Sequence, residues 1–591
     1  MSSTESIDEQ KKGFYFYDWG KSAFETSVTV AILPVWFSTL FLAANGIHLE
    51  LGNMKLTSDT VWSFAVFGSA LIIALTSPIM GAIADRTKIK ILMLRIFTYV
   101  GAGATLLMGG ALVFGIGFKW IWLLAMFVLA NLGLNGAGVF YNAILPSLGD
   151  EDEMDDISNT AYAYGYLGGG ILLVIHLGLL LATSYADWAI AFALSTSGIW
   201  WYGFAFITFN NLKEPEIKNP VENLTFGSAL AIAGHELGGT LREIKVRFKV
   251  LFLYLLAYFF FIDGINSVTS LAGIYGPAVL GIGLIANMIV IIMAQFVAAP
   301  AAIGFTKLSE KTGTKKALTI ACIGWCIVIV GALGFAPLEL ESHDEYDIQY
   351  NWVNTDNQSG YYTAVINDDT INVAISGTEQ LWLNQWSDVI PTKENSEDSD
   401  IIQFNYEEIN GNQYTNISKI NLLVKDIEDS RFSISISDGP LDNKKNVGIK
   451  HPTNLGDETL DTIPSVVREY VWSNLGITVF YQWMIMGLLA GLLLGGSQGL
   501  ARSLYCQMVP ESKSAEFFGF FGFFGKVAAL LGPLLYGIVG TIFGSSRAAL
   551  ASIGLLIVIG TILLTFVDVE KGIKLAKEFD EEYYNNISEE E

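Results

Sequence analysis

Three charged residues stand close together near the start of the chain, in a stretch that leads into a long apolar segment. Asp18 and Glu25 are seven residues apart, and Lys21 lies between them at spacings of three and four. On an α-helix these spacings place the side chains on one face, as a ladder of alternating charge. Because charges are costly in lipid, the ladder predicts a helix face turned to a protein interior or a water-filled cavity.

A second interpretation stays open for two of these residues. Asp18 and Lys21 would also fit the membrane surface, with the lysine side chain reaching out to water. Glu25 lies about a turn deeper and fits the surface less well. Asp263, inside another apolar run, is expected to be functional for the same reason. A buried carboxylate that changes its protonation, or takes up sodium, is the minimal device for coupling to a gradient, and Glu25 and Asp263 are the leading candidates.

Other polar side chains within apolar runs extend the candidate pathway for a substrate or an ion. His176 is one, although a single membrane histidine commonly hydrogen-bonds a neighbouring helix. Arg502 suits either an anionic substrate group or an anchor of its helix, and Lys526 is deep enough to face a cavity. The residues expected to hold a solute are Tyr141, Asn142, Tyr162, Asn266 and Gln482.

The composition shows which elements must position these groups. The chain has 591 residues, of which 52% are hydrophobic and 16% charged, and this is too apolar for a soluble protein of its size. About twelve apolar runs have the roughly 20 residues that a membrane-crossing helix needs. The predicted crossings are 14–42, 61–83, 91–115, 119–146, 160–183, 187–209, 250–275, 278–304, 316–338, 475–500, 516–541 and 547–568.

The crossings fall into two sets of six, which predicts an all-α polytopic membrane protein made of two six-helix bundles with a small, mostly β insert. The predicted domains are a first bundle (1–209), a cytoplasmic linker (210–249), helices seven to nine (250–338), an extracellular acidic insert (339–469), helices ten to twelve (470–570) and an acidic cytoplasmic tail (571–591).

Lys and Arg residues in the short loops set the expected orientation. They concentrate in the loop after the second helix, in the linker and in the loop after the eighth helix, which places these loops and both termini in the cytoplasm. We therefore expect an integral protein of the cell membrane, without a removable signal peptide. The expected partners are the lipid bilayer and a small-molecule substrate, without nucleic acid, and the chain is expected to be a monomer.

The insert differs sharply from the rest in composition. It holds 25 Asp and Glu against 8 Lys and Arg, which we interpret as a solvated acidic surface. Alternating apolar residues in Arg431–Ser437, followed by the turn at Asp438, predict a strand. Further strands are predicted at Tyr361–Ile366, Ile371–Ile375, Gln380–Trp386, Ile401–Tyr406 and Ile417–Val424.

The two halves of the chain repeat four short patterns in the same order, as transporters with internal repeats do. Phe16-Tyr17-Asp18 parallels Phe261-Ile262-Asp263, and the loop at 81–88 parallels the loop at 307–314. Tyr141-Asn142 before Pro146 parallels Tyr505-Cys506 before Pro510. Gly165-Tyr166-Leu167-Gly168 parallels Gly519-Phe520-Phe521-Gly522.

These motifs resemble those of a known transporter family. Gly81-x-x-x-Asp85-Arg86 resembles the loop signature of the major facilitator superfamily, in which two six-helix bundles rock about a central site. Tyr17-Asp18-Trp19-x-x-Ser22, Phe140-Tyr141-Asn142 and Arg502-Ser503-Leu504-Tyr505 are similar to the UMF1 branch, which is related to the Atg22-like vacuolar effluxers. The resemblance covers the twelve helices and omits the insert.

The resemblance implies a gate on the cytoplasmic side. Asp85 is expected to cap the N-terminus of a facing helix, with Arg86 pairing across the bundles. Glu310, in the matching loop of the second half, and Glu516, at the start of the eleventh helix, are placed in the same gate. The alternative for this loop is topological: a basic loop retained in the cytoplasm needs no gate.

The resemblance also implies secondary active transport of a small solute by alternating access, with amino acids and efflux as the expected case. No cofactor or metal is expected beyond a coupling proton or sodium ion. An enzyme is disfavoured, because Gly20-Lys21-Ser22 lacks the first glycine of a phosphate-binding loop. The rival hypothesis is a membrane-anchored receptor or adhesion protein that binds through its insert, but such an anchor would not need Glu25 or Asp263.

Overall fold

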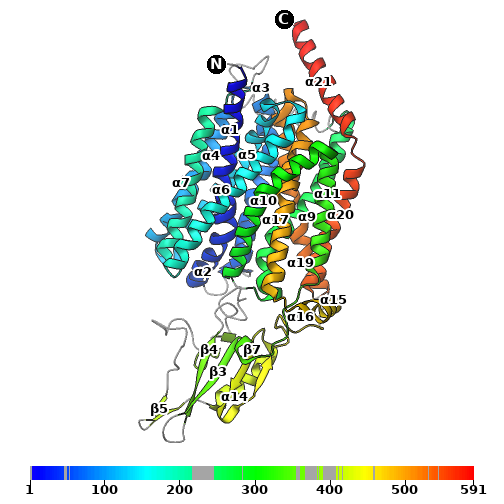
Figure 1. The fold of residues 1–591 in the computed structure, drawn as a ribbon. Coiled ribbons are helices and arrows are strands. Elements are labelled where there is room, and N and C mark those ends of the chain that lie inside the picture. Colours follow the sequence, from blue (N-terminus) through cyan, green and yellow to red (C-terminus); the bar gives the residue numbers. More distant parts are fainter. Residues whose placement is uncertain are drawn as a thin grey trace.

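The computed structural model describes residues 3–590 except 46–48, 52–53, 57, 216–241, 243–244, 283, 355–359, 367–381, 384, 391–406, 410–411, 415–416, 457–458, 530 and 544. Within these residues, 12 helices are long and apolar enough to cross a membrane, which confirms the predicted number. Both termini lie at one end of the helical body and the insert lies at the other (Figure 1). We call these ends the terminal side and the insert side.

The first bundle contains six crossings. In chain order they are α1 (Ser3–Ala23) with the π-helix η1 (Phe24–Ile32) and α2 (Leu33–Asn45), α3 (Ser58–Arg86), α4 (Lys90–Leu107) with the 3₁₀-helix η2 (Met108–Val113), α5 (Ile116–Ile144), α6 (Met154–Ala182) and α7 (Asp187–Asn211). A small hairpin of β1 (Leu49–Leu51) and β2 (Met54–Leu56) follows the first crossing. Helices dominate because lipid offers no partner for backbone N–H and C=O groups, which a helix pairs internally.

The second bundle also contains six crossings. They are α9 (Lys249–Leu280), α10 (Leu284–Thr312), α11 (Thr314–Ala332), α17 (Val479–Gln507), α18 (Ser514–Ala528) with α19 (Leu531–Phe543), and α20 (Ser546–Thr565). The eleventh crossing, predicted as one helix over 516–541, is broken between α18 and α19. Pro533 supplies a reason, since a proline ring clashes with the carbonyl four residues earlier, at Ala529.

Closely packed glycines join the two bundles. On α3, a side chain at Gly81 would overlap the Ala515 carbonyl at the start of α18. On α18, a Cβ at Gly519 would lie 2.7 Å from the Ser77 carbonyl oxygen of α3, and the Ser77 hydroxyl donates to the Gly519 carbonyl at 3.1 Å. Small residues let helix backbones approach closely where lipid provides no hydrophobic drive. Gly81 and Gly519 therefore let α3 and α18 pack closely against each other.

The insert folds around a four-stranded sheet with its own apolar core. The strand order is β4-β3-β7-β8, with β3 and β7 parallel and the other two pairs antiparallel. The strands are β3 (Ile348–Asn354), β4 (Gly360–Ile366), β7 (Ser433–Ser437) and β8 (Lys445–Val447), and a separate hairpin consists of β5 (Glu407–Ile409) and β6 (Asn412–Tyr414). The core beneath the sheet includes Ile348, Tyr350, Ile420 and Ile434.

Two of the strand predictions are confirmed and two are wrong. β7 and β4 lie where alternation predicts them. Ile417–Val424 is instead the helix α14 (Ile417–Asp426), whose buried Ile420 and Leu423 recur at helical spacing. Trp382 and Leu383 are helical rather than extended. The segments Ile371–Ile375 and Ile401–Tyr406 lie outside the described residues.

The insert is fixed to the second bundle through buried polar contacts. Arg547, at the start of α20, donates from Nη1 to Asp461 Oδ1 at 2.8 Å, and both side chains are buried. Nearby, the Ser545 hydroxyl donates to the Thr459 carbonyl at 2.6 Å. A buried ion pair tolerates the loss of neither partner, because the remaining charge would be left uncompensated.

The C-terminal tail is a helix, α21 (Val569–Glu590), rather than only an acidic extension. Lys577 on α21 pairs with Glu151 of the first bundle at 2.9 Å, and Asp580 accepts hydrogen bonds from the backbone of Glu511 and Ser512. The remaining short helices are η3 (Leu145–Leu148), η4 (Glu151–Glu153), η5 (His343–Glu345), η7 (Ile427–Asp429), η8 (Gly439–Leu441), α15 (Thr462–Val467), η9 (Arg468–Trp472), α16 (Ser473–Leu475) and η10 (Glu511–Lys513).

Replacing Arg547 with methionine should loosen the insert. The variant leaves Asp461 buried without its ion partner, at a cost of about 3–5 kcal/mol. We expect a lower melting temperature of the full chain in detergent and faster proteolysis of the insert. The double variant Arg547→Met/Asp461→Leu should regain most of the loss, whereas Glu339→Gln, in an exposed pair with Arg468, should cost under about 1 kcal/mol. Equal losses in the single and double variants would contradict this role.

Candidate functional site

The charge ladder predicted at the start of the chain is present. Lys21 Nζ lies 3.1 Å from Asp18 Oδ1 and 3.0 Å from Glu25 Oε2. The helix changes from α to π at Phe24, directly before Glu25. π-helical turns widen the backbone spiral and are frequent at functional sites. The first crossing therefore changes its geometry where its charges reach the membrane interior.

Asp18 is held between two cations from different bundles. Its Oδ2 accepts a hydrogen bond from the Tyr141 hydroxyl at 2.7 Å and lies 3.5 Å from Nη1 of Arg502. Tyr141 also stacks on Phe14, with ring centroids 4.0 Å apart, which fixes its hydroxyl. Asp18 is only 1% exposed. These contacts favour the protein interior over the membrane surface as the location of Asp18.

The Arg502 side chain extends from α17 to the first bundle, where it makes its other contacts. Nε donates to the Ser158 hydroxyl at 2.8 Å and Nη2 to the Ser158 carbonyl at 2.9 Å. Nη1 donates to Asn142 Oδ1 at 3.3 Å, and the guanidinium lies over the Tyr162 ring, 4.4 Å from its centroid. The planar fork of an arginine suits such multiple recognition. Arg502 thus ties the bundles together.

Glu25 faces the space between the bundles. Its side chain is 48% exposed and lies 3.0 Å from Lys21, and its charge contributes to the electrostatic environment of Tyr166 on α6 and Lys526 on α18. Lys21 is likewise close to Lys526. The site therefore presents an accessible carboxylate from the first bundle and a cation from the second.

Asp263 occupies a second, fully buried position on α9. Its Oδ1 accepts from the Gly532 backbone N–H at 3.1 Å and from the Ser267 hydroxyl at 3.3 Å. Gly532 belongs to the first turn of α19, so Asp263 satisfies a free N–H at the break in the eleventh crossing. Within the described part of the chain, Asp263 Oδ2 has no hydrogen-bond partner. A carboxylate in this setting is costly as an anion unless it takes up a proton or a cation.

Three further candidates lie apart from this cluster or contact it little. His176 Nε2 lies 3.0 Å from the Thr196 hydroxyl of the neighbouring α7, the helix-to-helix contact that the sequence offered as an alternative. The side-chain amide of Gln482 hydrogen-bonds to the backbone of Ala336 and Ile477 at the insert side, which argues for a structural role. Asn266 is half-buried, one turn from Asp263 on α9.

On the terminal side, Asp85 caps a helix of the other bundle, as predicted. Its carboxylate accepts from the backbone N–H groups of Ala515 at 3.0 Å and Glu516 at 2.6 Å, at the start of α18. The partnering cation is Lys90, 2.8 Å away, and Lys90 also donates to the Ser514 hydroxyl. The side chain of Arg86 lies outside the described part of the structure.

The other two predicted gate residues differ in their placement. Glu516 is buried, and its backbone N–H donates to the Asp85 carboxylate, so it contacts Asp85 through its main chain. Glu310 lies near the end of α10 and is exposed to solvent, unlike the buried pair of Asp85 and Lys90.

Sequence reasoning missed a cluster around Asp155. Its carboxylate, at the start of α6, accepts from the hydroxyls of Ser503 on α17 and Thr314 on α11. The acidic run at 150–156 suggests only a helix boundary in the sequence, and Ser158 carries no signal of its own. Ser158 donates to the Gly499 carbonyl at 2.8 Å in addition to binding Arg502.

These contacts between the bundles lie between the middle of the crossing helices and the terminal side. They begin near the middle of α6 and α17, where the Tyr166 hydroxyl donates to the Leu494 carbonyl at 3.1 Å, and continue to the terminal side. The two bundles are therefore joined on the terminal side, while Glu25 stays accessible near the middle.

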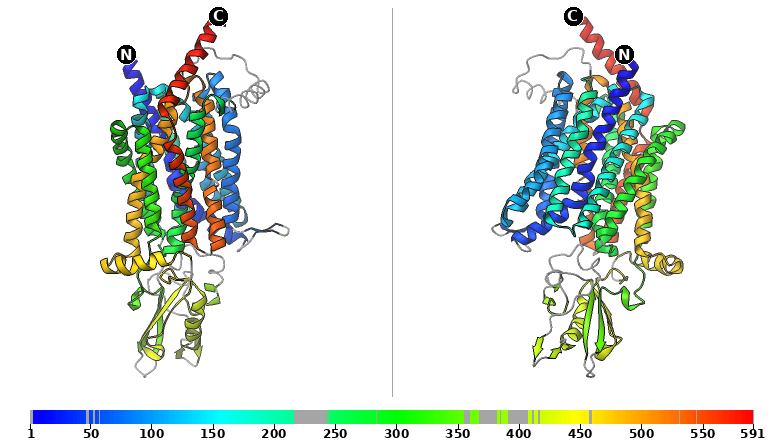
Figure 2. Two further views of the ribbon diagram at one scale, coloured as in Figure 1. Left: turned by 90° about the vertical axis from the view of Figure 1, so that its right-hand side faces the viewer. Right: turned by 60° about the vertical axis from the view of Figure 1, so that its left-hand side comes forward.

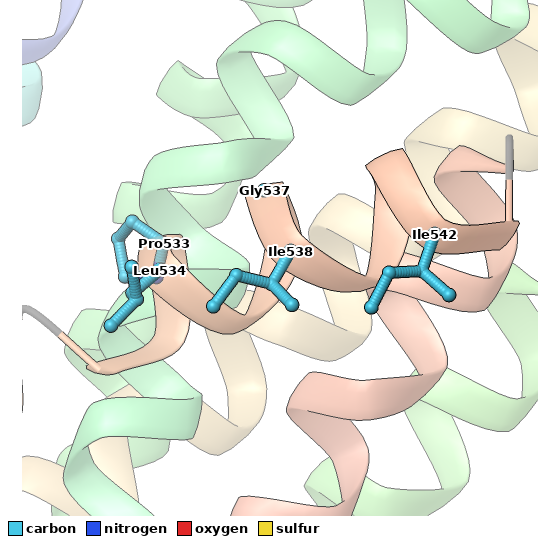
Figure 3. Close-up of a pocket in the computed structure, with 5 residues that line it drawn as sticks. All are labelled: Pro533, Leu534, Gly537, Ile538 and Ile542. Atoms are coloured by element: carbon cyan, nitrogen blue, oxygen red, sulfur yellow. The ribbon is translucent and has the colours of Figure 1, made fainter.

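An apolar groove on α19 is not the site. Figure 3 shows its lining, which contains neither a polar nor a charged side chain. The lining residues are Pro533, Leu534, Gly537, Ile538 and Ile542. The charged cluster between the bundles, and not this groove, carries groups that can recognise a polar solute.

Solved structures with this architecture identify its class. A proton:xylose symporter, XylE, aligns with 98% of this chain and 100% of its own, with a TM-score of 0.56 and 11% identity. FucP, a transporter in the outward conformation, aligns with 95% of this chain and 98% of its own, with a TM-score of 0.51 and 11% identity. The fold is that of the major facilitator superfamily.

Sequence comparison identifies the family within that class. The family model described as vacuole effluxer Atg22 like matches residues 8–343 and 466–577, which leaves out most of the insert. The chain belongs to this family. YxiO of Bacillus subtilis (strain 168), named as an uncharacterized MFS-type transporter, is 23% identical over 576 residues, 96% of this chain and 97% of its own. Autophagy-related protein 22 of Kluyveromyces lactis is 31% identical over 109 residues, only 18% of this chain and 22% of its own.

Replacing Asp85 with asparagine should open the terminal side. The change removes the anion that pairs with Lys90 and caps α18, and should weaken the closed state by about 1–2 kcal/mol, roughly a tenfold shift in population. Spin labels at Lys88→Cys and Lys316→Cys, both exposed, would report the distance between the bundles. We expect a longer distance in Asp85→Asn. Glu310→Gln is the matched control and should leave the distance unchanged, and an equal response in the two variants would contradict the gate.

Proposed function

We propose that the chain is a secondary active transporter that moves a small zwitterionic solute, such as an amino acid, by alternating access. The single observation that carries the proposal is an accessible carboxylate, Glu25, whose side chain is 48% exposed, next to a junction of the two bundles made by Asp18, Arg502 and Asp85 on the terminal side. An anchor for a receptor domain would have no use for this arrangement, and the comparisons lend no support to that alternative.

The charges of the site suit a zwitterion. The ammonium group of an amino acid would pair with Glu25, and its carboxylate would pair with Lys526, which lies on the opposite bundle. Tyr162 and Tyr166 of α6 lie close to this pair and offer hydroxyl groups and ring faces. A solute that bridges the two bundles would stabilise an arrangement in which they approach each other, as alternating access requires.

Coupling to a proton or sodium gradient is proposed to occur at Asp263. Its second carboxylate oxygen has no hydrogen-bond partner among the described residues, and its first oxygen caps the α19 half of a broken helix. A proton or sodium ion at Asp263 would neutralise the buried charge and alter its hold on Gly532. The state of the ion site would thereby be linked to the α18–α19 break.

We propose export from the cell as the direction. The terminal side carries the basic loops and is assigned to the cytoplasm, which places the insert outside the cell membrane. One chain contains both bundles and the whole proposed site, so a monomer is sufficient for the proposed transport.

Uptake of labelled amino acids into proteoliposomes tests this proposal. Glu25→Gln should reduce transport of zwitterions by at least about tenfold, because it removes the anion that meets the ammonium group. Asp263→Asn should abolish accumulation driven by a pH or sodium gradient while leaving exchange between the two sides, since the solute site stays intact.

The matched control is Asp156→Asn, an exposed carboxylate next to the buried Asp155. This variant should transport as the wild type does. Uptake that ignores both Glu25→Gln and Asp263→Asn would assign those charges to structure and contradict the proposed mechanism.

A further inference from the structure

A short helical segment lies across the insert-side end of the second bundle. It runs from Thr462 to Leu475 through α15, η9 and α16 without interruption. Figure 2 shows it in yellow, running crosswise to the membrane helices between their ends and the sheet of the insert. It leads through a short turn into α17, so it joins the insert to the tenth crossing.

One side of this segment is fixed to the protein. Trp472 donates from its indole to the Gly334 carbonyl at 2.8 Å, and Arg468 donates to the Thr453 carbonyl at 2.7 Å. Pro464 is buried on the same side. These three residues recur at a spacing of four, so they share one face of the helix. These contacts fix how the helix is rotated about its own axis, and so determine which of its residues point away from the protein.

A second side is apolar and open. Val466 and Tyr470, four residues apart, are 54% and 67% exposed, and Ile463 on the same side is 38% exposed. Glu469 directly precedes Tyr470, so its side chain points to a different side of the helix from that of Tyr470. A helix whose apolar residues are exposed on one side and whose polar residues gather on another is typical of a membrane interface.

The level of the segment matches that of the membrane surface. Gly334, which binds Trp472, lies two residues beyond the end of α11, and Val479 begins α17 four residues after the segment ends. The last turns of α11 expose Ile327 and Val330 at 66% and 68%, as expected of a crossing helix that faces lipid. The segment is therefore attached at the ends of two crossing helices, where the membrane surface is expected.

We propose that the segment 462–475 is an interfacial anchor whose apolar side lies in the boundary between headgroups and acyl chains of the insert-side leaflet. Tyr470 and Trp472 are aromatic residues of the kind that favour this boundary. The occupant of the apolar side is lipid. The anchor holds the root of the insert at a fixed height and sets the level at which α17 enters the membrane, whatever solute the bundles carry.

Fluorescence quenching in lipid nanodiscs tests the anchor in the full chain. A fluorophore is attached at Tyr470→Cys on the apolar side or at Glu469→Cys on the polar side, in a background where the half-buried Cys326 is replaced by alanine. The discs contain phosphatidylcholine and phosphatidylglycerol, with or without a lipid that carries a nitroxide near its headgroup. Iodide in the buffer quenches labels that lie in water.

The anchor predicts iodide quenching at position 470 at least about threefold weaker than at 469, with stronger quenching at 470 by the nitroxide lipid. A label at Val466→Cys should be quenched in the same way as the label at position 470. Agreement between the two positions shows that the result does not come from a local disturbance caused by one substitution. Equal iodide quenching at 469 and 470 would overturn the proposal. Protection at 470 that disappears when each disc holds one copy of the chain would also overturn it, because a second copy would then be the occupant.

Discussion

The architecture depends on neutralising Asp18 inside the protein. A single carboxylate buried away from water is too costly to persist without partners, and Asp18 is buried where the two bundles meet. Lys21 of its own helix and Arg502 of the other bundle supply the compensation. Because one of these cations belongs to the second bundle, the electrostatic requirement of one helix becomes a bond between the halves of the molecule.

Several other features follow from this junction. Arg502 brings Ser158, Asn142 and Tyr162 into one network, and the neighbouring hydrogen bonds of Asp85 and Asp155 join the bundles on the terminal side. Glu25 lies one turn beyond Lys21 and is 48% exposed, so the same ladder that joins the bundles through Asp18 also carries an accessible charge. Any movement that separates the bundles must break charge-assisted hydrogen bonds, and such a movement needs compensation from solute or ion binding.

The sequence alone predicted the helices and the ladder because both have local causes. Apolar length determines a crossing, and the spacing of Asp18, Lys21 and Glu25 determines a shared face. The partners of Arg502 could not be predicted, since they come from residues far away in the chain. The same holds for Lys90, which donates to Ser514 at a separation of 424 residues, and for Gln482, whose backbone partner Ala336 is 146 residues away. In the insert, the prediction of a strand at Ile417–Val424 is wrong, because a short apolar run fits both the helical and the strand period. The packing of α14 against the core decides in favour of the helix.

Sided thiol labelling at Glu25→Cys tests the central claim most directly. The account holds that the site opens toward the insert side while Asp18 and Arg502 keep the terminal side shut. A membrane-impermeant thiol reagent should therefore label Glu25→Cys from the insert side and not from the terminal side, and adding Arg502→Gln should make labelling from the terminal side possible. Labelling from the terminal side with Arg502 intact, or sidedness that Arg502→Gln leaves unchanged, would contradict the account.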